Sequence, residues 1–180
     1  EEIKQHLLCA GHEVTDCGTS SGDLSVDYPD CGFRAAEAVA NHKADRGILF
    51  CGTGIGMSIT ANKVAGIRAA LCHDHFTAAL SRRHNDANVL VIGSRVTGSG
   101  LAKEIVDTWL CEEFEGGRHA IRVEKIREFE RKHSSEAVNR MLGEHRGGKD
   151  RSDRTPACEA QARTDEGQKH VLKGFQGACP

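Results

Sequence analysis

The chain has 180 residues, enough for one compact domain with its own hydrophobic core and a tail. Its 24 lysines and arginines nearly balance 26 acidic residues, and the formal net charge of -2 gives no reason to expect nucleic acid or an anionic membrane as a partner. No apolar stretch approaches the roughly 20 residues that span a bilayer, and no basic and apolar leader opens the sequence.

Eight cysteines are spread along the chain without a CxxC pair. This spacing is unlike the compact frameworks of small secreted proteins, so we expect free thiols in a reducing cytoplasm. Cys72, His73 and His75 form one short group of metal-ligand residue types. Because two histidines at i and i+2 do not share a helix face, and no second ligand pair follows at zinc spacing, we predict no metal.

The first segment, 1–10, has the apolar spacing of an amphipathic helix, with Ile3, Leu7 and Leu8 inward and Gly11 after its end. It begins without an N-cap residue and without a preceding loop. We therefore expect that the domain starts before this helix.

Strand and helix patterns alternate from there on. The continuous apolar run 47–50 is typical of a parallel strand that is covered on both faces. The expected strands are 13–17, 46–51, 67–72 and 88–92, and the expected later helices are 29–41, 57–64, 74–83, 100–111 and 118–132.

This alternation predicts an α/β protein, a three-layer sandwich with a parallel, Rossmann-like sheet. From residue 133 the large apolar residues become sparse, and Gly, Arg, Glu, Asp and Ser dominate. Such a composition cannot bury enough surface to offset chain entropy. We predict a folded domain at 1–132 and a disordered tail at 133–180.

Cys51 stands at the end of the apolar run and is followed by Gly52, Gly54 and Gly56. Ligands of open α/β sheets bind at the carboxyl ends of strands, and glycines let backbone N–H groups approach a phosphate or an oxyanion. The GxGxG spacing matches neither the dinucleotide fingerprint nor the P-loop, and a plain tight turn is the alternative. A thiolate here can attack a carbonyl or remove a proton from carbon, and the residues alone do not choose.

Two further groups carry chemistry. His84 closes a helix at a place where an imidazole can act as acid or base, but taken alone this group is better explained as a solvated helix end. Arg118 and Arg122 are at i and i+4, so both guanidinium groups project from one helix face. They are suited to hold a phosphate, and a charged exterior helix is the alternative.

Together these groups resemble ribose-5-phosphate isomerase type B, of the ribose/galactose-6-phosphate isomerase family. The resemblance covers about residues 1–130. It rests on six segments in the order and spacing of the family, namely 27–29, 51–56, 61–63, 81–86, 93–95 and 115–119.

The resemblance implies an aldose–ketose isomerase that interconverts D-ribose 5-phosphate and D-ribulose 5-phosphate through an enediolate, in the non-oxidative pentose phosphate pathway, without a metal or an organic cofactor. Cys51 is implied as the base, and His84 and Thr53 as the residues that open the sugar ring. A homodimer or a dimer of dimers with shared active sites is also implied. The implied substrate-binding residues are Tyr28, Gly52, Gly54, Ile55, Gly56, Asn85, Arg95, Arg118 and Arg122.

The chain departs from this family at its start. Members begin with a short apolar strand that ends in a substrate-binding Asp-His pair, and no position here matches it. With this first strand missing from the sheet, we expect an N-terminally truncated chain that is less stable than a full domain and weakly active or inactive.

Three other functions stay open on the residues. The substrate can be another phosphorylated aldose, such as allose or galactose 6-phosphate. The chain can be a non-catalytic partner subunit, or a redox protein built around the thiol of Cys51.

Overall fold

The computed structural model describes residues 1–19 and 26–144, with side chains described as far as residue 134. Residues 1–124 form one compact unit, and a second unit begins at Lys125. Each unit is described by itself below. No helix in the described part of the chain is both long and apolar enough to cross a membrane.

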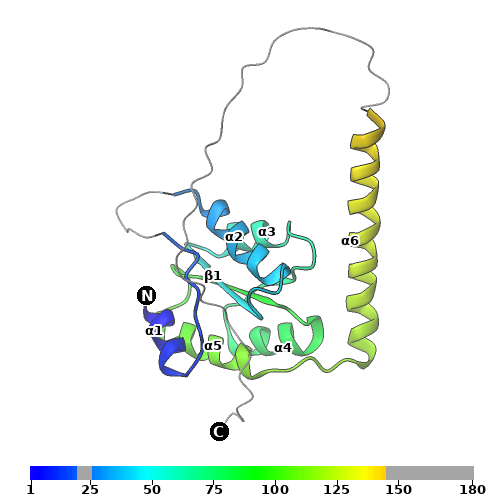
Figure 1. The fold of residues 1–180 in the computed structure, drawn as a ribbon. Helices are drawn as coiled ribbons and strands as arrows, with labels where there is room; N and C mark the ends of the chain where they lie inside the picture. The colour runs from blue at the N-terminus through cyan, green and yellow to red at the C-terminus, as the bar shows by residue number, and fades with distance from the viewer. Residues whose placement is uncertain (20–25, 145–180) are drawn as a thin grey trace, which may run out of the picture. The chain divides into compact units, whose positions relative to one another are not determined.

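Helices and strands alternate through the first unit, as expected (Figure 1). A continuous apolar sequence forms β3, in which all five residues are buried. Asp74 is the N-cap of the helix before β3, and its side chain accepts a hydrogen bond from the Thr77 amide. The elements are α1 (Glu2–Cys9), α2 (Tyr28–Ala40), β1 (Gly47–Cys51), α3 (Ile55–Ala61), β2 (Ala69–Leu71), α4 (His75–Asn85), β3 (Val89–Gly93), α5 (Ser99–Cys111) and α6 (Gly117–Glu144).

The three strands form one parallel sheet in the order β1-β3-β2. Gly47 pairs with Val89 and Cys51 pairs with Gly93, so β1 and β3 begin and end together. Parallel neighbours require crossover connections, and the helices between the strands supply them. The sheet therefore has one edge where all strands begin and an opposite edge where they end.

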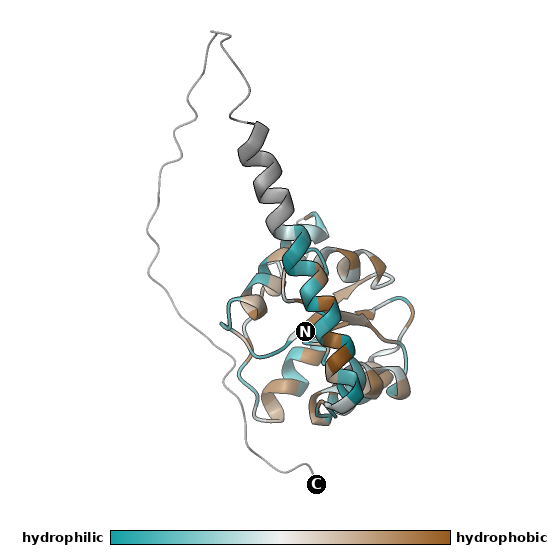
Figure 2. Ribbon diagram, turned by 90° about the vertical axis from the view of Figure 1, so that its right-hand side faces the viewer, coloured by the Kyte–Doolittle hydropathy of each residue, from teal (hydrophilic) through white to brown (hydrophobic). Residues whose placement is uncertain are grey.

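Helices cover both faces of this sheet, which confirms the three-layer α/β sandwich with a parallel, Rossmann-like sheet (Figure 1). Leu90 and Ile92 of β3 pack with α1, α4 and α5, whereas Val89 and Val91 pack with α2 and α3. Successive strand residues point to opposite faces, so an entirely apolar strand serves both cores. In Figure 2 the strands have mainly hydrophobic colours, and the helices carry both kinds of residue.

The segment 13–17, expected to be a strand, does not pair with any strand in the described part of the chain. Val14 nevertheless packs against the core on the α1 side. An extended segment becomes a strand only through ladder hydrogen bonds with a neighbour, and the described sheet offers none to this segment. The expected strand at 13–17 is therefore wrong.

The last helix is longer than expected. The sequence predicted an end at residue 132, whereas α6 continues to Glu144. The division into a domain at 1–132 and a tail at 133–180 stays a prediction, and residues 145–180 of that tail lie outside the described residues.

Candidate active site

A glycine-rich loop joins the end of β1 to α3 and lies against the end of β3. Gly54 has a left-handed φ of 81°. A side chain there would collide with Leu71 and would lie 3.1 Å from the Gly93 nitrogen. A Cβ on Gly93 would in turn lie 2.6 Å from the Thr53 carbonyl oxygen. Both positions require glycine, because the loop and the strand end meet backbone to backbone.

Cys51 is held at the mouth of this loop as a free, partly exposed thiol. The Gly54 amide donates a hydrogen bond to its sulfur at 3.2 Å. Its carbonyl oxygen accepts from the Ser94 amide at 2.8 Å and from the Ser94 hydroxyl at 3.2 Å. These contacts fix the side chain and the backbone of Cys51 at the end of β1.

Two larger side chains border the loop. The ring of Tyr28 is so near Gly56 that a Cβ on Gly56 would lie 2.6 Å from it. The side chain of Arg95 lies against Gly52, and its Nε lies 3.4 Å from the position that a Cβ on Gly52 would take. The structure thus brings together a set of residues that we call the Cys51 loop cluster: Tyr28, Cys51, Gly52, Thr53, Gly54, Ile55, Gly56 and Arg95.

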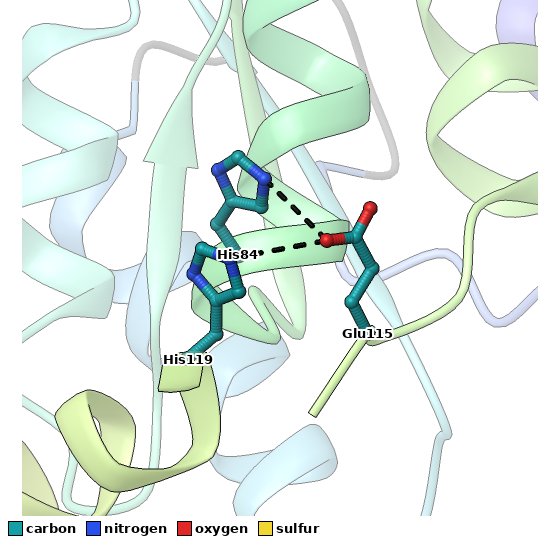
Figure 3. A group of neighbouring side chains, drawn as sticks. All are labelled: His84, Glu115 and His119. Carbon is teal, nitrogen blue, oxygen red and sulfur yellow. Dashed lines mark ion pairs between the residues drawn. The ribbon is translucent and has the colours of Figure 1, made fainter. Parts of the chain in front are cut away.

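A second set of side chains, with the predicted His84 and Arg118 among them, gathers where α4 ends and α6 begins. We call His84, Glu115, Arg118 and His119 the histidine cluster. Figure 3 shows His84, Glu115 and His119. The rings of His84 and His119 stack with centroids 4.0 Å apart and an interplanar angle of 5°. One oxygen of Glu115 lies 3.7 Å from His84 Nε2 and 3.8 Å from His119 Nε2.

The remaining predicted residues flank this cluster. Asn85 follows His84 as the last residue of α4 and is exposed. Arg122 lies one helical turn after Arg118, and both side chains are exposed. The positive charge of Arg122 is one of the causes that lower the pKa of His119.

The two groups lie at opposite edges of the sheet. Cys51 pairs with Gly93 at the end of β3, whereas α4 ends with Asn85, four residues before β3 begins at Val89. Five strand residues separate these edges by about 13 Å. No hydrogen bond or ion pair between described residues joins the Cys51 loop cluster to the histidine cluster.

The histidine cluster also has the residue types of a metal site. Its three candidate ligand atoms, from His84, Glu115 and His119, lie within 4.8 Å of one another. However, the Nε of Arg118 donates a hydrogen bond to His119 Nε2, the atom that a cation would need. The stacked rings are nearly parallel, so an ion between them would lie outside both ring planes. The expectation of no metal stays a prediction.

Sequence analysis assigned no role to three residues that touch the predicted ones. Glu115 and His119 belong to a quoted segment, and their i,i+4 spacing was the available signal. Ser94 also belongs to a quoted segment, and only the tertiary structure places it on the Cys51 carbonyl.

Comparison with known proteins agrees with this fold. A family model described as Ribose/Galactose Isomerase matches residues 1–126. Ribose-5-phosphate isomerase B of Escherichia coli is 54% identical over 131 residues, 73% of this chain and 87% of that protein. D-erythrulose-4-phosphate isomerase of Pectobacterium atrosepticum is 49% identical over 71% of this chain and 84% of its own. The solved ribose-5-phosphate isomerase B of Clostridium thermocellum is 57% identical with a TM-score of 0.71, and the match covers 73% and 88% of the two chains.

The fold, the two groups of side chains and these relatives define a sugar-phosphate isomerase of the parallel α/β class. This confirms the enzyme class expected from the sequence. The chain belongs to the ribose/galactose isomerase family.

Proposed function

We propose that the chain interconverts D-ribose 5-phosphate and D-ribulose 5-phosphate, within the non-oxidative pentose phosphate pathway. The relatives of Escherichia coli and Clostridium thermocellum are named for ribose 5-phosphate. The observation that carries the proposal is the free thiol of Cys51 at a strand end. Its sulfur accepts a hydrogen bond from the Gly54 amide, and its carbonyl oxygen accepts one from the Ser94 hydroxyl.

Cys51 moves the proton in this reaction. Its thiolate removes the proton from C2 of the open aldose. The electron pair of that bond forms the C1–C2 double bond of an enediolate, while the π pair of the C1 carbonyl moves onto O1. The thiol then returns a proton to C1, and a proton passes from O2 to O1, which leaves the ketose. Backbone amides of the loop from Gly52 to Gly56 hold the enediolate oxygens, a role for which preorganised donors are effective.

Ring opening precedes this transfer. His84, with an imidazole that works near neutral pH, passes a proton to the ring oxygen, and Thr53 assists at the anomeric hydroxyl. Tyr28 lines the sugar pocket beside Gly56, and Asn85 hydrogen-bonds sugar hydroxyl groups.

Arginines hold the phosphate. Arg118 and Arg122 are exposed on successive turns of α6, where their forked donors match phosphate oxygens. Arg95 lies against Gly52 at the edge of the sheet that carries Cys51.

A second copy of the chain completes each site in this proposal. His84 and Cys51 lie at opposite edges of one sheet, so the same copy does not supply both to one sugar. In a homodimer, or a dimer of dimers, the histidine cluster of one copy reaches the Cys51 loop cluster of the other. Exposed apolar side chains on the first unit, such as Ile55, Ile59 and Phe76, offer surface for this contact.

The experiment combines turnover with mixing of variants. The purified chain is assayed for ribose 5-phosphate isomerisation and for exchange of the C2 proton with solvent deuterium. We expect Cys51→Ala to abolish exchange while phosphate binding is kept, and undiminished exchange would place the base elsewhere. Neither Cys51→Ala nor His84→Asn is expected to be active alone, whereas their mixture regains turnover. A mixture as inactive as its parts would contradict the shared site.

The identity of the substrate has a second candidate. The relative named for D-erythrulose 4-phosphate is 49% identical, and the family model also names galactose. Equal or higher kcat/KM for erythrulose, allose or galactose phosphates than for the pentose would replace the pentose assignment. Turnover that appears only after mixing with a longer relative would make the chain a partner subunit, and peroxide-sensitive Cys51 without any turnover would favour a redox role.

We propose further that proton transfer by a thiol and an imidazole needs no metal or organic cofactor. A chelator should leave the rate unchanged, and restoration of a lost rate by a divalent cation would contradict this. Cys9, Cys17, Cys31, Cys51 and Cys72 are free, and on this basis we propose the cytoplasm as the compartment. Cys111 is disulfide-bonded, so the expectation of free thiols is wrong at that residue.

A further inference from the structure

The histidine cluster joins two elements that are far apart in the sequence. The Glu115 amide donates to the Arg83 carbonyl at 3.0 Å, and Arg83 Nε donates to Glu112 Oε2 at 2.6 Å. These contacts attach the segment before α6 to the last turn of α4. As a result the buried ring of His119 lies flat on the partly exposed ring of His84 (Figure 3).

Burial and a neighbouring arginine both favour the neutral form of His119. Arg118 Nε lies 3.4 Å from His119 Nε2 in a hydrogen bond, and a guanidinium only donates. His119 Nε2 therefore offers a lone pair, so the ring is neutral with its hydrogen on Nδ1. Burial lowers the pKa of His119, and the nearby charges of His84, Arg118 and Arg122 lower it further, against a smaller opposite effect of Glu115.

Glu115 lies beside both imidazole rings. Its Oε2 is 3.7 Å from His84 Nε2 and 3.8 Å from His119 Nε2. Arg83 Nε lies 3.8 Å from the other carboxylate oxygen, Oε1. His84 thus lies between this carboxylate and the stacked ring of His119, and the two contacts hold its imidazole in place.

We propose that His119 is a positioning residue that links the ring-opening imidazole of His84 to the phosphate-binding guanidinium of Arg118. This proposal rests on the roles of those two residues in the proposed function. One face of the His119 ring holds His84 by stacking, and its Nε2 lone pair holds Arg118. The two ends of the sugar phosphate are thereby aligned through one side chain.

Two substitutions separate these contacts. His119→Phe keeps an aromatic ring for stacking and removes the acceptor, whereas His119→Gln keeps an acceptor near the Nε2 position and removes the ring. We expect His119→Phe to raise KM about tenfold, because a hydrogen bond to a charged group is lost, with kcat changed little. We expect His119→Gln to lower kcat about fivefold, because stacking is lost, with KM changed little.

Two readouts do not require turnover. The ring protons of His84 should show an upfield ring-current shift in NMR spectra, which His119→Phe keeps and His119→Gln loses. Binding of inorganic phosphate, followed by calorimetry, should weaken in His119→Phe and persist in His119→Gln. These measurements decide about His119 even where isomerisation is absent, so failure of this proposal and failure of the proposed function are distinguishable.

A double mutant tests the link to Arg118. Arg118→Ala should weaken phosphate binding, and adding His119→Phe to it should cause no further loss, because both changes remove one contact. His12→Gln, a histidine outside the cluster, is the control and should change neither readout. Equal losses of kcat and phosphate affinity in both His119 variants, or additive losses in the double mutant, would overturn the proposal.

Discussion

The ring of Tyr28 packs directly on the backbone of Gly56, and two ring carbons and the phenol oxygen lie 2.6 to 2.7 Å from the place where a Cβ would be. This contact connects the start of α2 to the start of α3, and it places a phenol beside the loop that follows Cys51. Under the proposed function, in which Tyr28 lines the sugar pocket, the width of that pocket depends on glycine at position 56.

Gly56→Ala is expected to move Tyr28 and to weaken sugar binding. Tyr28 is 47% exposed, so its ring can swing toward solvent, and the cost in stability should be below about 1 kcal/mol. We expect KM to rise severalfold with a smaller change in kcat, measured by steady-state kinetics with ribose 5-phosphate. Gly100→Ala in α5 is the control, because an added Cβ there meets nothing within 4 Å. An unchanged KM in Gly56→Ala would remove Tyr28 from the pocket.

Gly93→Ala should be much more damaging. Its Cβ would lie 2.6 Å from the Thr53 carbonyl oxygen and 2.7 Å from the carbonyl carbon, and both are backbone atoms that cannot rotate away. We expect a loss of about 2 kcal/mol or more in the free energy of unfolding, together with loss of activity, as the loop is pushed from β3. Urea unfolding measures the first effect. Gly98→Ala, which meets open space, should be almost neutral, and equal stability of the two variants would contradict the packing described.

Much of the fold is readable from local patterns. The apolar sequence of β3 predicts a strand buried on both faces, and all five of its residues are buried. Cys51 was placed at a strand end because an apolar run stops there and glycines follow. Such features depend on residues next to one another in the sequence, so no tertiary information is needed to recognise them.

Other features depend on partners that the sequence does not reveal. The segment 13–17 has a strand-like pattern, but a strand also needs a neighbour for its backbone groups. The continuation of α6 beyond residue 132 includes Ala137, Met141 and Leu142, whose helix propensities are favourable even though the stretch is polar overall. The stacking of His84 on His119 joins residues on different helices, and only the fold shows that they meet.

Arg82 is expected to be the main anchor of the end of α4. Its side chain is only 3% exposed, and its Nη1 donates to the Ala87 carbonyl at 2.6 Å and to Asp86 Oδ1 at 3.0 Å. Arg82→Met should lower the free energy of unfolding by about 3 kcal/mol, because a buried charge pair and a buried carbonyl lose their partner. Thermal or urea unfolding measures the change.

The neighbouring arginine is a matched control for this prediction. Arg83 also forms an ion pair, with Glu112 at 2.6 Å, but its side chain is 45% exposed. Arg83→Met should cost less than about 1 kcal/mol, as exposed ion pairs usually do. A cost for Arg83→Met equal to that for Arg82→Met would mean that burial does not set the importance of these arginines.

The stability of the protein should decrease toward acid pH partly because of His119. In the unfolded chain this imidazole titrates near 6.5, and in the folded protein burial and the charges of His84, Arg118 and Arg122 lower its pKa. Between the two values the unfolded chain binds more protons, so the free energy of unfolding falls as the pH falls through this window. His119→Gln removes that contribution, and its free energy of unfolding should vary less steeply between about pH 7.5 and 5.5. Urea unfolding at several pH values measures the slope.

His42→Asn is the control, since His42 is exposed and has a left-handed φ of 55° that asparagine tolerates. Identical slopes for the wild-type chain and His119→Gln would show that His119 is not held neutral by its surroundings, and the hydrogen bond from Arg118 would then have to be assigned differently.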